Sequence, residues 1–142
     1  MWNYLIDEDR RLVITTVSDE LTGTDILEHR QTLKSDPRFR PSFSQLVDLT
    51  GVTSVALDYR AVEKLSREHI FSRESRRAFV ATTLLAYGMS RMFVSMRALA
   101  GEEERMEVFK NRNKALRWLL KPDSKSPIAN SRTSDDLWLL RK

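Results

Sequence analysis

The chain has 142 residues, 24 basic and 20 acidic side chains, and no cysteine. This length suits one domain, and a domain of this size can bury about 70% of the surface of its unfolded chain. The lack of cysteine excludes a disulfide framework, a thiolate metal site and a cysteine nucleophile, and it fits a reducing cytoplasm.

The N-terminal segment MWNYLIDEDRR has acidic residues where a signal peptide would need an apolar block. No window approaches the roughly 20 apolar residues of a membrane span. We therefore expect a cytoplasmic protein without integral membrane association. The net charge of +4 permits contact with polyanions, but acidic residues interrupt the bases in SREHIFSRESRR. This pattern favours a solvated surface, and we expect no nucleic-acid partner.

The first elements read as a β-hairpin followed by a helix. Residues 2–6 alternate between apolar and polar side chains, residues 7–10 form a polar turn, and β-branched residues follow in RLVITTV. A hairpin makes the first strand antiparallel to the second. The segment Thr22-Gly23-Thr24 then precedes a helix over 25–35 with a threonine as its N-cap.

The segment from Phe43 to Leu65, FSQLVDLTGVTSVALDYRAVEKL, organises the rest of the chain. Residues 44–49 form a buried strand, residues 48–51 have turn chemistry that ends it, and Asp58 caps a helix that runs to about residue 68. In an open α/β sheet, loops at the carboxyl ends of strands gather functional groups. The polar candidates in this loop are Asp48, Thr50, Thr53, Ser54 and Asp58.

The second half of the chain alternates between strands and helices. The apolar run at 76–82 predicts an interior strand. The helical periodicity of 84–100 predicts the longest helix, and residues 106–109 are expected to form a brief strand. Asn111 or Asn113 caps a last helix, which Pro122 stops. The fold class is therefore α/β: a single-domain mixed sheet of about five strands covered by about four helices. The hairpin strand is antiparallel and the remaining strands are mainly parallel, because strand and helix alternation requires crossover connections.

We expect the domain to span residues 1–121 and a C-terminal tail to span residues 122–142. The tail begins as the polar, proline-containing segment DSKSPIANSRTSDD and ends in the apolar LWLL, residues 137–140. Four apolar side chains together are unfavourable in water, so this end docks on its own domain or on a neighbouring subunit. Self-association into a homo-oligomer is consistent with that apolar end and with an uncovered sheet edge.

The element order, together with LVITTVSDELTG, FSQLVDLTGV, RRAFVA, AYGMSRMF and VFKNRNKALRWL, resembles the SpoIIAA-like family of small bacterial proteins, which is related to STAS and SEC14 domains. The resemblance covers residues 3 to about 120 and includes no catalytic signature. It implies a mixed sheet packed against helices. It also implies a non-enzymatic role, either protein–protein regulation or binding of an apolar small molecule.

The resemblance includes one departure. In phosphorylated members of the family, a strand ending in Asp-Leu-Ser-Gly-Val precedes a serine that a kinase modifies at the head of the next helix. This chain has DLTGV at 48–52, but Asp58 stands where that serine would be. A fixed carboxylate supplies one negative charge in place of the nearly two of a phosphate. A plain N-cap is the preferred explanation of Asp58.

No residue set in the sequence specifies a reaction, so we expect no catalytic residue, no metal and no cofactor. His29 reads as a helix-face residue paired with Asp25, and His69 as a cation at a helix end. Neither histidine has a metal-binding spacing such as HExxH, and nucleophile-elbow and Walker patterns are absent. Asp48 is the one acidic residue whose position suggests a site, and the preferred explanation is a carboxylate bonded within its own turn.

Methionines at helical spacing in 84–100 indicate either core packing, which is the default, or the wall of an apolar groove. In the second case Tyr87, Met89, Met92 and Phe93 line the groove, with Arg91 or Arg97 at its mouth for a carboxylate or phosphate headgroup. A second basic feature is KNRNK at 110–114, which crowds the start of the last helix. It indicates tolerated surface charge or an anion site.

These observations give three ranked hypotheses. The first is a non-catalytic binding or regulatory module that contacts an unknown protein through the Asp48 to Tyr59 segment. The second is a carrier or sensor of a small apolar ligand or lipid beside helix 84–100. The third is an enzyme of unknown class. The candidate binding residues are Asp48, Thr50, Asp58, Tyr59, Tyr87, Met89, Arg91 and Met92.

Overall fold

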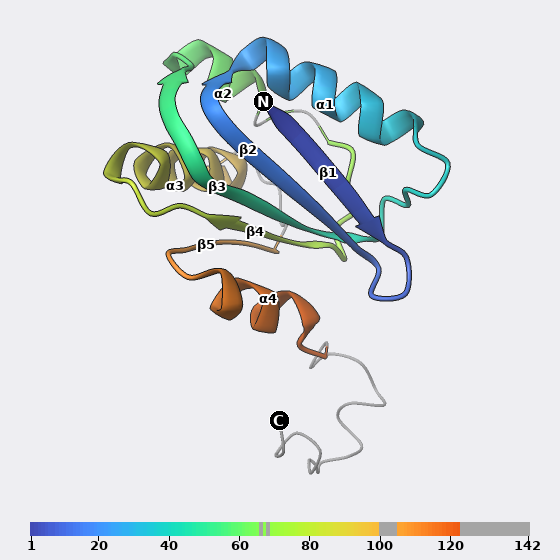
Figure 1. Cartoon of the computed structure of the whole chain (residues 1–142). Coiled ribbons are helices and arrows are strands. Elements are labelled where there is room, and N and C mark those ends of the chain that lie inside the picture. The colour runs from blue at the N-terminus through green and yellow to red at the C-terminus, as the bar shows by residue number, and fades with distance from the viewer. Residues whose placement is uncertain (66, 68, 100–104, 123–142) are drawn as a thin grey trace.

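A computed structural model describes residues 1–65, 67, 69–99 and 105–122. Within these residues the chain forms one five-stranded sheet in the order β1-β2-β3-β4-β5, with four helices (Figure 1). The predicted element order is confirmed. The elements are β1 (Trp2–Asp7), β2 (Leu12–Thr22), α1 (Gly23–Ser35), β3 (Ser44–Ala56), α2 (Tyr59–Leu65), β4 (Arg76–Val80), α3 (Leu84–Leu99), β5 (Arg105–Phe109) and α4 (Arg112–Leu120).

Strand β3 lies at the centre of the sheet. It pairs in parallel with β2 on one side and with β4 on the other, and β5 continues the parallel part beyond β4. The N-terminal strand β1 runs antiparallel to β2, as the hairpin pattern predicts. Leu46 and Val47 are buried within β3. The apolar character of this segment thus reflects helices packed on both faces of a central strand.

The prediction that residues 48–51 end this strand is wrong, because β3 continues to Ala56 and pairs with β2 throughout. Register shifts occur in β2 between Thr16 and Ser18 and between Asp19 and Glu20. A Cβ atom at Gly51 would lie 3.2 Å from the Cβ of Ser18, so this glycine permits the close approach of the two strands. Glycine inside a strand is typical of such irregular pairing, and the sequence pattern resembles that of a turn.

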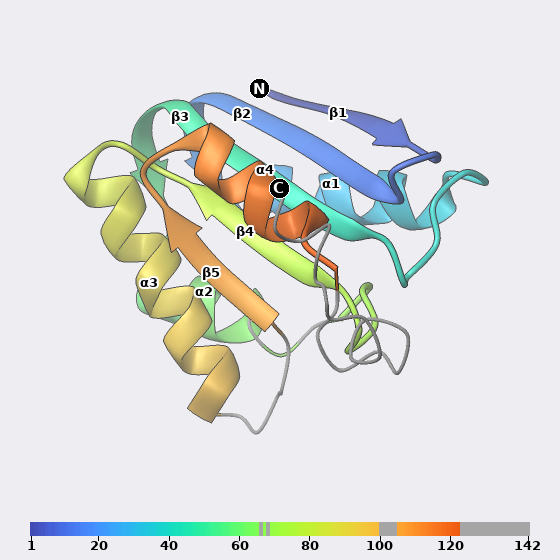
Figure 2. The same cartoon turned by 90° about the horizontal axis from the view of Figure 1, so that it is seen from below.

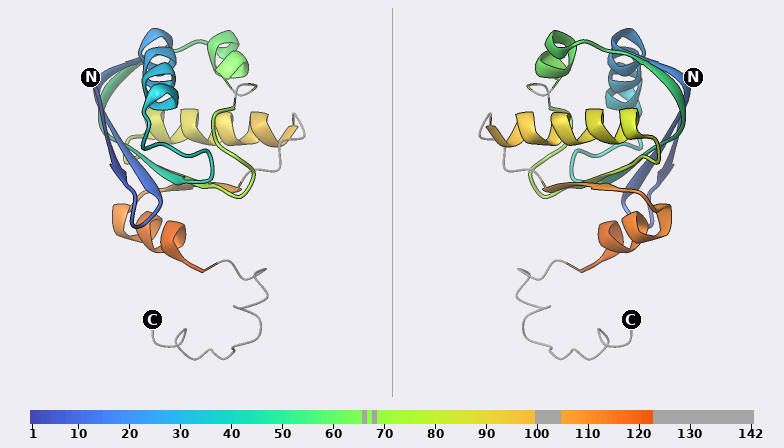
Figure 3. Two further views of the ribbon diagram at one scale, coloured as in Figure 1. Left: turned by 90° about the vertical axis from the view of Figure 1, so that its right-hand side faces the viewer. Right: turned by 90° about the vertical axis from the view of Figure 1, so that its left-hand side faces the viewer.

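The sheet separates the helices into two unequal layers. Helices α1, α2 and α3 cover one face, and α4 alone covers the other (Figures 2 and 3). The apolar side chains of the strands follow this division. Val47, Leu49 and Phe79 belong to the core under α1–α3, whereas Leu46 and Ala78 pack against Ala115 and Leu119 of α4. Alternate residues of one strand point to opposite faces, so β3 contributes to both cores.

Side chains at the helix termini satisfy backbone groups that the helices leave free. Thr22 accepts a hydrogen bond from the Asp25 backbone N–H, and Asn111 accepts one from the Lys114 N–H. Asp58 Oδ1 accepts the Ala61 N–H at 2.8 Å, which confirms it as the N-cap of α2.

Arg76, at the start of β4, secures the other end of α4. Its guanidinium donates to the carbonyl oxygen of Trp118 at 2.8 Å and stacks over the Trp118 ring at 5.8 Å. The last carbonyls of a helix lack intrahelical partners and carry the negative end of its dipole, so a cation here is favourable. Arg76 thereby holds α4 against the sheet.

Some predictions lie partly or wholly outside the described residues. Helix α2 ends at Leu65, short of the predicted residue 68, and residues 66 and 68 are not described. Residues 100–104 are not described either, and they include the predicted last residue of the helix over 84–100. The apolar LWLL segment and nearly all of the predicted tail also lie outside the described residues.

The central position of β3 predicts a large effect of Leu46→Ala on stability. Leu46 is fully buried among Ala78, Ala115 and Leu119. We expect the free energy of unfolding, measured by urea denaturation, to fall by about 2–5 kcal/mol, because the substitution leaves a cavity. Leu84→Ala is the matched control: Leu84 is 89% exposed, and its loss should change stability by less than about 0.5 kcal/mol. Equal effects of the two substitutions would contradict the described core.

Candidate functional site

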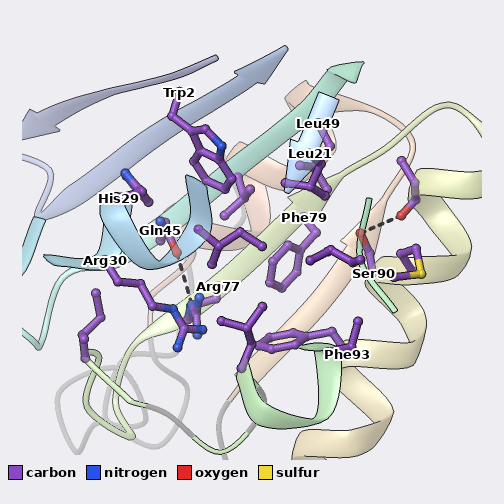
Figure 4. Close-up of a pocket in the computed structure, with 18 of the residues that line it drawn as sticks. Trp2, Leu21, His29, Arg30, Gln45, Leu49, Arg77, Phe79, Ser90 and Phe93 are labelled. Atoms are coloured by element: carbon purple, nitrogen blue, oxygen red, sulfur yellow. Dashed lines mark hydrogen bonds between the residues drawn. The ribbon is translucent and has the colours of Figure 1, made fainter. Parts of the chain in front are cut away.

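A cavity of about 110 Å³ lies between the sheet and the layer formed by α1, α2 and α3 (Figure 4). Its walls are mostly apolar, with a few polar groups on the sheet side and on α1. Leu49 and Phe79 line it from the sheet, and Ala86, Met89 and Phe93 line it from α3. The further lining residues are Trp2, Leu21, Ile26, His29, Arg30, Leu33, Gln45, Val47, Leu57, Val62, Leu65, Ile70, Phe71, Arg77 and Ser90.

The polar residues of this wall form a continuous hydrogen-bonded strip across β2, β3, β4 and α1. Arg77 Nε donates to Gln45 Oε1 at 3.2 Å, and Gln45 Nε2 donates to the Thr15 hydroxyl at 3.0 Å. The Thr15 hydroxyl lies 3.2 Å from His29 Nε2. All four side chains are buried. Buried polar groups require such pairing, so the strip is a built feature of the core.

His29 is neutral in this environment. Burial, followed by the positive charges of Arg30 and Arg77, lowers its pKa to about 4. A neutral imidazole has one acceptor nitrogen. Because the Thr15 hydroxyl already accepts from Gln45, its own proton can be donated to His29 Nε2. The predicted pairing of His29 with Asp25 is not what the structure shows, since the ring faces Thr15 and the sheet.

Trp2 closes the cavity from the side of β1. Its indole ring stacks on the His29 ring with a centroid distance of 4.9 Å. The indole N–H is buried and has no hydrogen-bond partner within the part of the chain that the structure describes. Figure 4 shows Trp2 pointing from β1 into the lined space, opposite Leu21 and above Gln45. The cavity is therefore bordered by a donor that lacks an acceptor.

The face that α3 turns to the core differs from the predicted methionine line. Ala86 and Ser90 are buried, and Ser90 donates its hydroxyl proton to the Ala86 carbonyl oxygen at 2.9 Å. Met89 lines the cavity, as predicted for a groove. Tyr87, Met92 and Arg91 do not line it. The ring of Tyr87 instead lies 5.0 Å from the Lys110 ammonium, and Arg91 is exposed.

Arg97 was one of two predicted headgroup-binding residues, and it is buried at the far end of α3. Its guanidinium lies 3.1 Å from His69 Nδ1 and 6.0 Å from the Phe93 ring centroid. It is not a lining residue of the cavity. The two guanidinium groups at the cavity belong to Arg30 and Arg77, and neither was singled out from the sequence.

Asp48 lies on the opposite face of the sheet. Its Oδ1 accepts the backbone N–H of Thr50 at 3.0 Å, as predicted for a carboxylate bonded locally, and also the Thr50 hydroxyl at 2.6 Å. Its Oδ2 forms an ion pair of 2.5 Å with Arg112 at the start of α4. Burial raises the pKa of Asp48, but the hydrogen bonds from Thr50 and Arg112 outweigh it and the net shift is downward.

This ion pair explains one unusual feature of the sequence. Bases at a helix N-terminus are unfavourable to the dipole, yet Arg112 begins α4 because it faces a carboxylate of the sheet. The predicted site residues are consequently separated. Asp48 and Thr50 face α4, whereas Asp58 and Tyr59 begin α2 on the other side of the sheet.

Comparison with solved structures identifies the architecture. The structure matches an uncharacterized protein of the DUF3478 family from Shewanella loihica PV-4, which has a SpoIIAA-like fold, with a TM-score of 0.54. The match covers 84% of this chain and 92% of that chain at 19% sequence identity. The fold is SpoIIAA-like. No family model and no curated protein matches the sequence.

The SpoIIAA-like fold places the cavity and Asp48 in different chemical settings. The cavity has apolar walls and a polar strip, while Asp48 accepts three hydrogen bonds, two from Thr50 and one from Arg112. Within the described residues, no group of three or more His, Asp and Glu side chains is arranged to hold a metal ion. No helix among them is long and apolar enough to cross a membrane. His29 bonds Thr15 on the α1 side of the sheet, whereas Asp48 bonds Arg112 on the α4 side, so the two residues belong to separate polar clusters.

The lowered pKa of His29 predicts a pH dependence of stability. The pKa of His29 is about 4 in the folded protein, against an ordinary value of 6.5 in the unfolded chain. The unfolded state therefore takes up the proton first as the pH falls. The stabilising contribution is complete above pH 6.5 and is lost progressively toward pH 4. It amounts to about 2 kcal/mol lost by pH 5. Urea unfolding at pH 7, 6 and 5 measures this slope.

His29→Gln serves as the control, because an amide can still bond Thr15 and does not titrate. In this variant the decline between pH 6.5 and pH 5 should be smaller by about 2 kcal/mol. An identical decline in both proteins would show that His29 titrates normally.

Proposed function

We propose that the protein is a non-catalytic binding module that contacts a protein partner through the carboxyl-terminal edge of its parallel strands. The heads of α1, α2 and α3 lie along this edge, because each helix follows the end of a strand. In open α/β folds this edge is the usual place for binding. The proposal keeps the predicted contribution of Asp58 and Tyr59 and leaves out Asp48, which faces α4.

The observation that carries the proposal is a set of exposed apolar side chains at two of these helix heads. Tyr59 is 65% exposed in the first turn of α2, and Leu84 and Leu85 are 89% and 54% exposed in the first turn of α3. Large side chains left in water at one edge mark contact surfaces more often than single scattered ones. Tyrosine is also enriched where interfaces carry most of their energy.

The charges near these side chains indicate the chemistry of the partner. Arg60 and Lys64 on α2 and Arg91 on α3 are exposed, and the whole chain carries a net charge of +4. Complementary charge at the rim of an interface speeds association and selects partners. We therefore propose a partner with an apolar contact flanked by acidic residues, and its association should weaken with added salt.

A binding role also agrees with the titratable groups. Enzyme sites bring together groups whose pKa values are shifted toward a task. In the described chain His29 and Asp48 are the buried titratable groups with lowered pKa values, and the sheet lies between them. Both are engaged in hydrogen bonds that support the core. These facts support a non-catalytic role.

The experiment compares proteins that the wild type and two variants retain from a cell extract, with partners identified by mass spectrometry. Tyr59→Ser and Leu84→Ser should each reduce capture of the same partner by at least about tenfold, because each removes a contact near the centre of the proposed surface. Purified partner should then show a Kd that rises with salt.

Leu5→Ser is the matched control, because Leu5 is 58% exposed on β1, far along the sheet order from α2 and α3. It should leave capture unchanged. If the same partner is retained equally by the wild type and by both helix-head variants, the proposed surface is wrong. Capture lost in all three variants would indicate a broader apolar stickiness and would also contradict it.

The cavity supports a second candidate function, the binding of a small apolar ligand. Its 110 Å³ is well below the roughly 300 Å³ of a pocket that encloses a drug-sized molecule. A carrier of long-chain lipids is therefore disfavoured. A compact ligand remains compatible with the lining.

A further inference from the structure

We propose that the apolar segment LWLL, residues 137–140, docks on a part of the sheet that α4 leaves uncovered. This segment lies outside the described residues, whereas its docking surface is built from described ones. That surface, named here the β1–α4 surface, consists of Leu5 of β1, Ile14 of β2, and Leu116 and Leu120 of α4. It lies on the opposite side of the sheet from α1, α2 and α3, so this docking is independent of the partner surface at the helix heads.

One row of apolar side chains runs from beneath α4 to the edge of the sheet. Leu46 of β3 pairs with Ile14 of β2, which pairs in turn with Leu5 of β1, and directly paired residues of neighbouring strands point to the same face. Leu46 is fully buried against α4, Ile14 is half-buried and Leu5 is 58% exposed. Figure 2 shows β1 lying to the side of α4 rather than beneath it. This face of the sheet therefore remains apolar beyond the helix.

Helix α4 carries apolar side chains on the flank that faces β1 and β2. Leu119 packs into the sheet, and Trp118 lies on the flank toward β5, where its ring centroid is 5.7 Å from that of Phe109. Because an α-helix has about 3.6 residues per turn, Leu116 and Leu120 lie on the other flank. Leu116 is half-buried and Leu120 is 43% exposed. These two side chains therefore border the uncovered row of β1 and β2.

The connection between residues 137–140 and the domain begins beside this surface. At the end of α4 the Arg76 guanidinium donates to the backbone oxygens of Lys121 and Pro122, which fixes the point where the chain leaves the helix. Residues 123–136 then lead to the LWLL segment. A connection of this length spans at most about 50 Å. Neighbouring strands are only about 4.8 Å apart, so the segment reaches β1 from the end of α4.

The character of the segment matches that of the surface. Residues 137–140 are consecutive large apolar side chains in a mostly polar stretch, and all the side chains of the β1–α4 surface are apolar and half-buried or exposed. Removal of both apolar surfaces from water favours their contact. Tethering within one chain gives the segment an effective concentration of about 1 mM, so a contact with millimolar affinity forms about half of the time. A second copy at micromolar concentration would have to bind about a thousandfold more tightly.

The test uses the 142-residue protein labelled with ¹⁵N and carrying one nitroxide spin label at Ser134→Cys. The chain has no native cysteine, so the label attaches at this position alone. A nitroxide broadens the resonances of nearby amides, and the reference is the same sample after chemical reduction of the nitroxide. The amide signals of Leu5 and Ile14 should lose at least about half of their intensity, because the segment is docked for about half of the time or more. The amide signal of Leu27 on α1 should keep its intensity.

Variants on both sides of the contact separate docking from chance proximity of the label. The double variant Leu137→Ser/Leu140→Ser removes apolar side chains from the segment, and Leu5→Ser removes one from the surface. Each should lower the docked fraction, followed by the broadening at Ile14, at least about threefold, because less apolar surface is buried. Leu27→Ser is the matched control, since Leu27 is 39% exposed on the opposite face of the sheet. It should leave the broadening at Ile14 unchanged.

Three outcomes would overturn the proposal. The first is an Ile14 signal that the label leaves unchanged, or broadens equally in the wild type and in Leu137→Ser/Leu140→Ser. The second is broadening that is strongest at Tyr59 and Leu84, because the segment would then occupy the helix heads. The third is broadening in unlabelled ¹⁵N protein mixed with spin-labelled ¹⁴N protein, because the segment would then dock on a second copy. The amide spectrum of each variant verifies that its fold is intact.

Discussion

The structure depends on β3 being buried on both faces at the centre of the sheet. Because successive side chains of a strand point in opposite directions, β3 divides its residues between two compartments. Gln45, Val47 and Leu49 face the cavity under α1–α3, while Leu46 and Asp48 face α4. This alternation places one buried polar cluster on each face of the sheet.

The two polar clusters compensate for the burial of ionisable groups in different ways. Burying a charge is costly unless hydrogen bonds or an opposite charge compensate. On the α4 face, Asp48 keeps its charge because Thr50 and Arg112 donate to it. On the other face, His29 gives up its charge and remains a neutral partner of Thr15. The first cluster joins α4 to the sheet, and the second joins α1 to the sheet and lines one wall of the cavity.

The structure separates residues that the sequence pattern grouped into one candidate site. Asp58 caps α2 and Met89 reaches the cavity, as their spacing indicates. Asp48, however, was grouped with Asp58 because Gly51 is typical of a turn. In the structure Gly51 lies inside β3 and permits its close pairing with β2. The one-residue difference between the two faces of a strand then places Asp48 with α4. No sequence motif marked Arg77 or Trp2, because their contacts are with residues distant in sequence. Arg77 bonds Gln45, and Trp2 stacks on His29.

The sequence alone determined the order of strands and helices, the antiparallel first strand and the capping residues, because periodicity and capping act between residues a few positions apart. The tertiary structure decided the partner of each buried polar group. Arg112 meets Asp48, and Gln45 joins Thr15 to Arg77. Such contacts join segments up to 64 residues apart. Local patterns carry no information about which distant side chain will lie within hydrogen-bond distance once the sheet has formed.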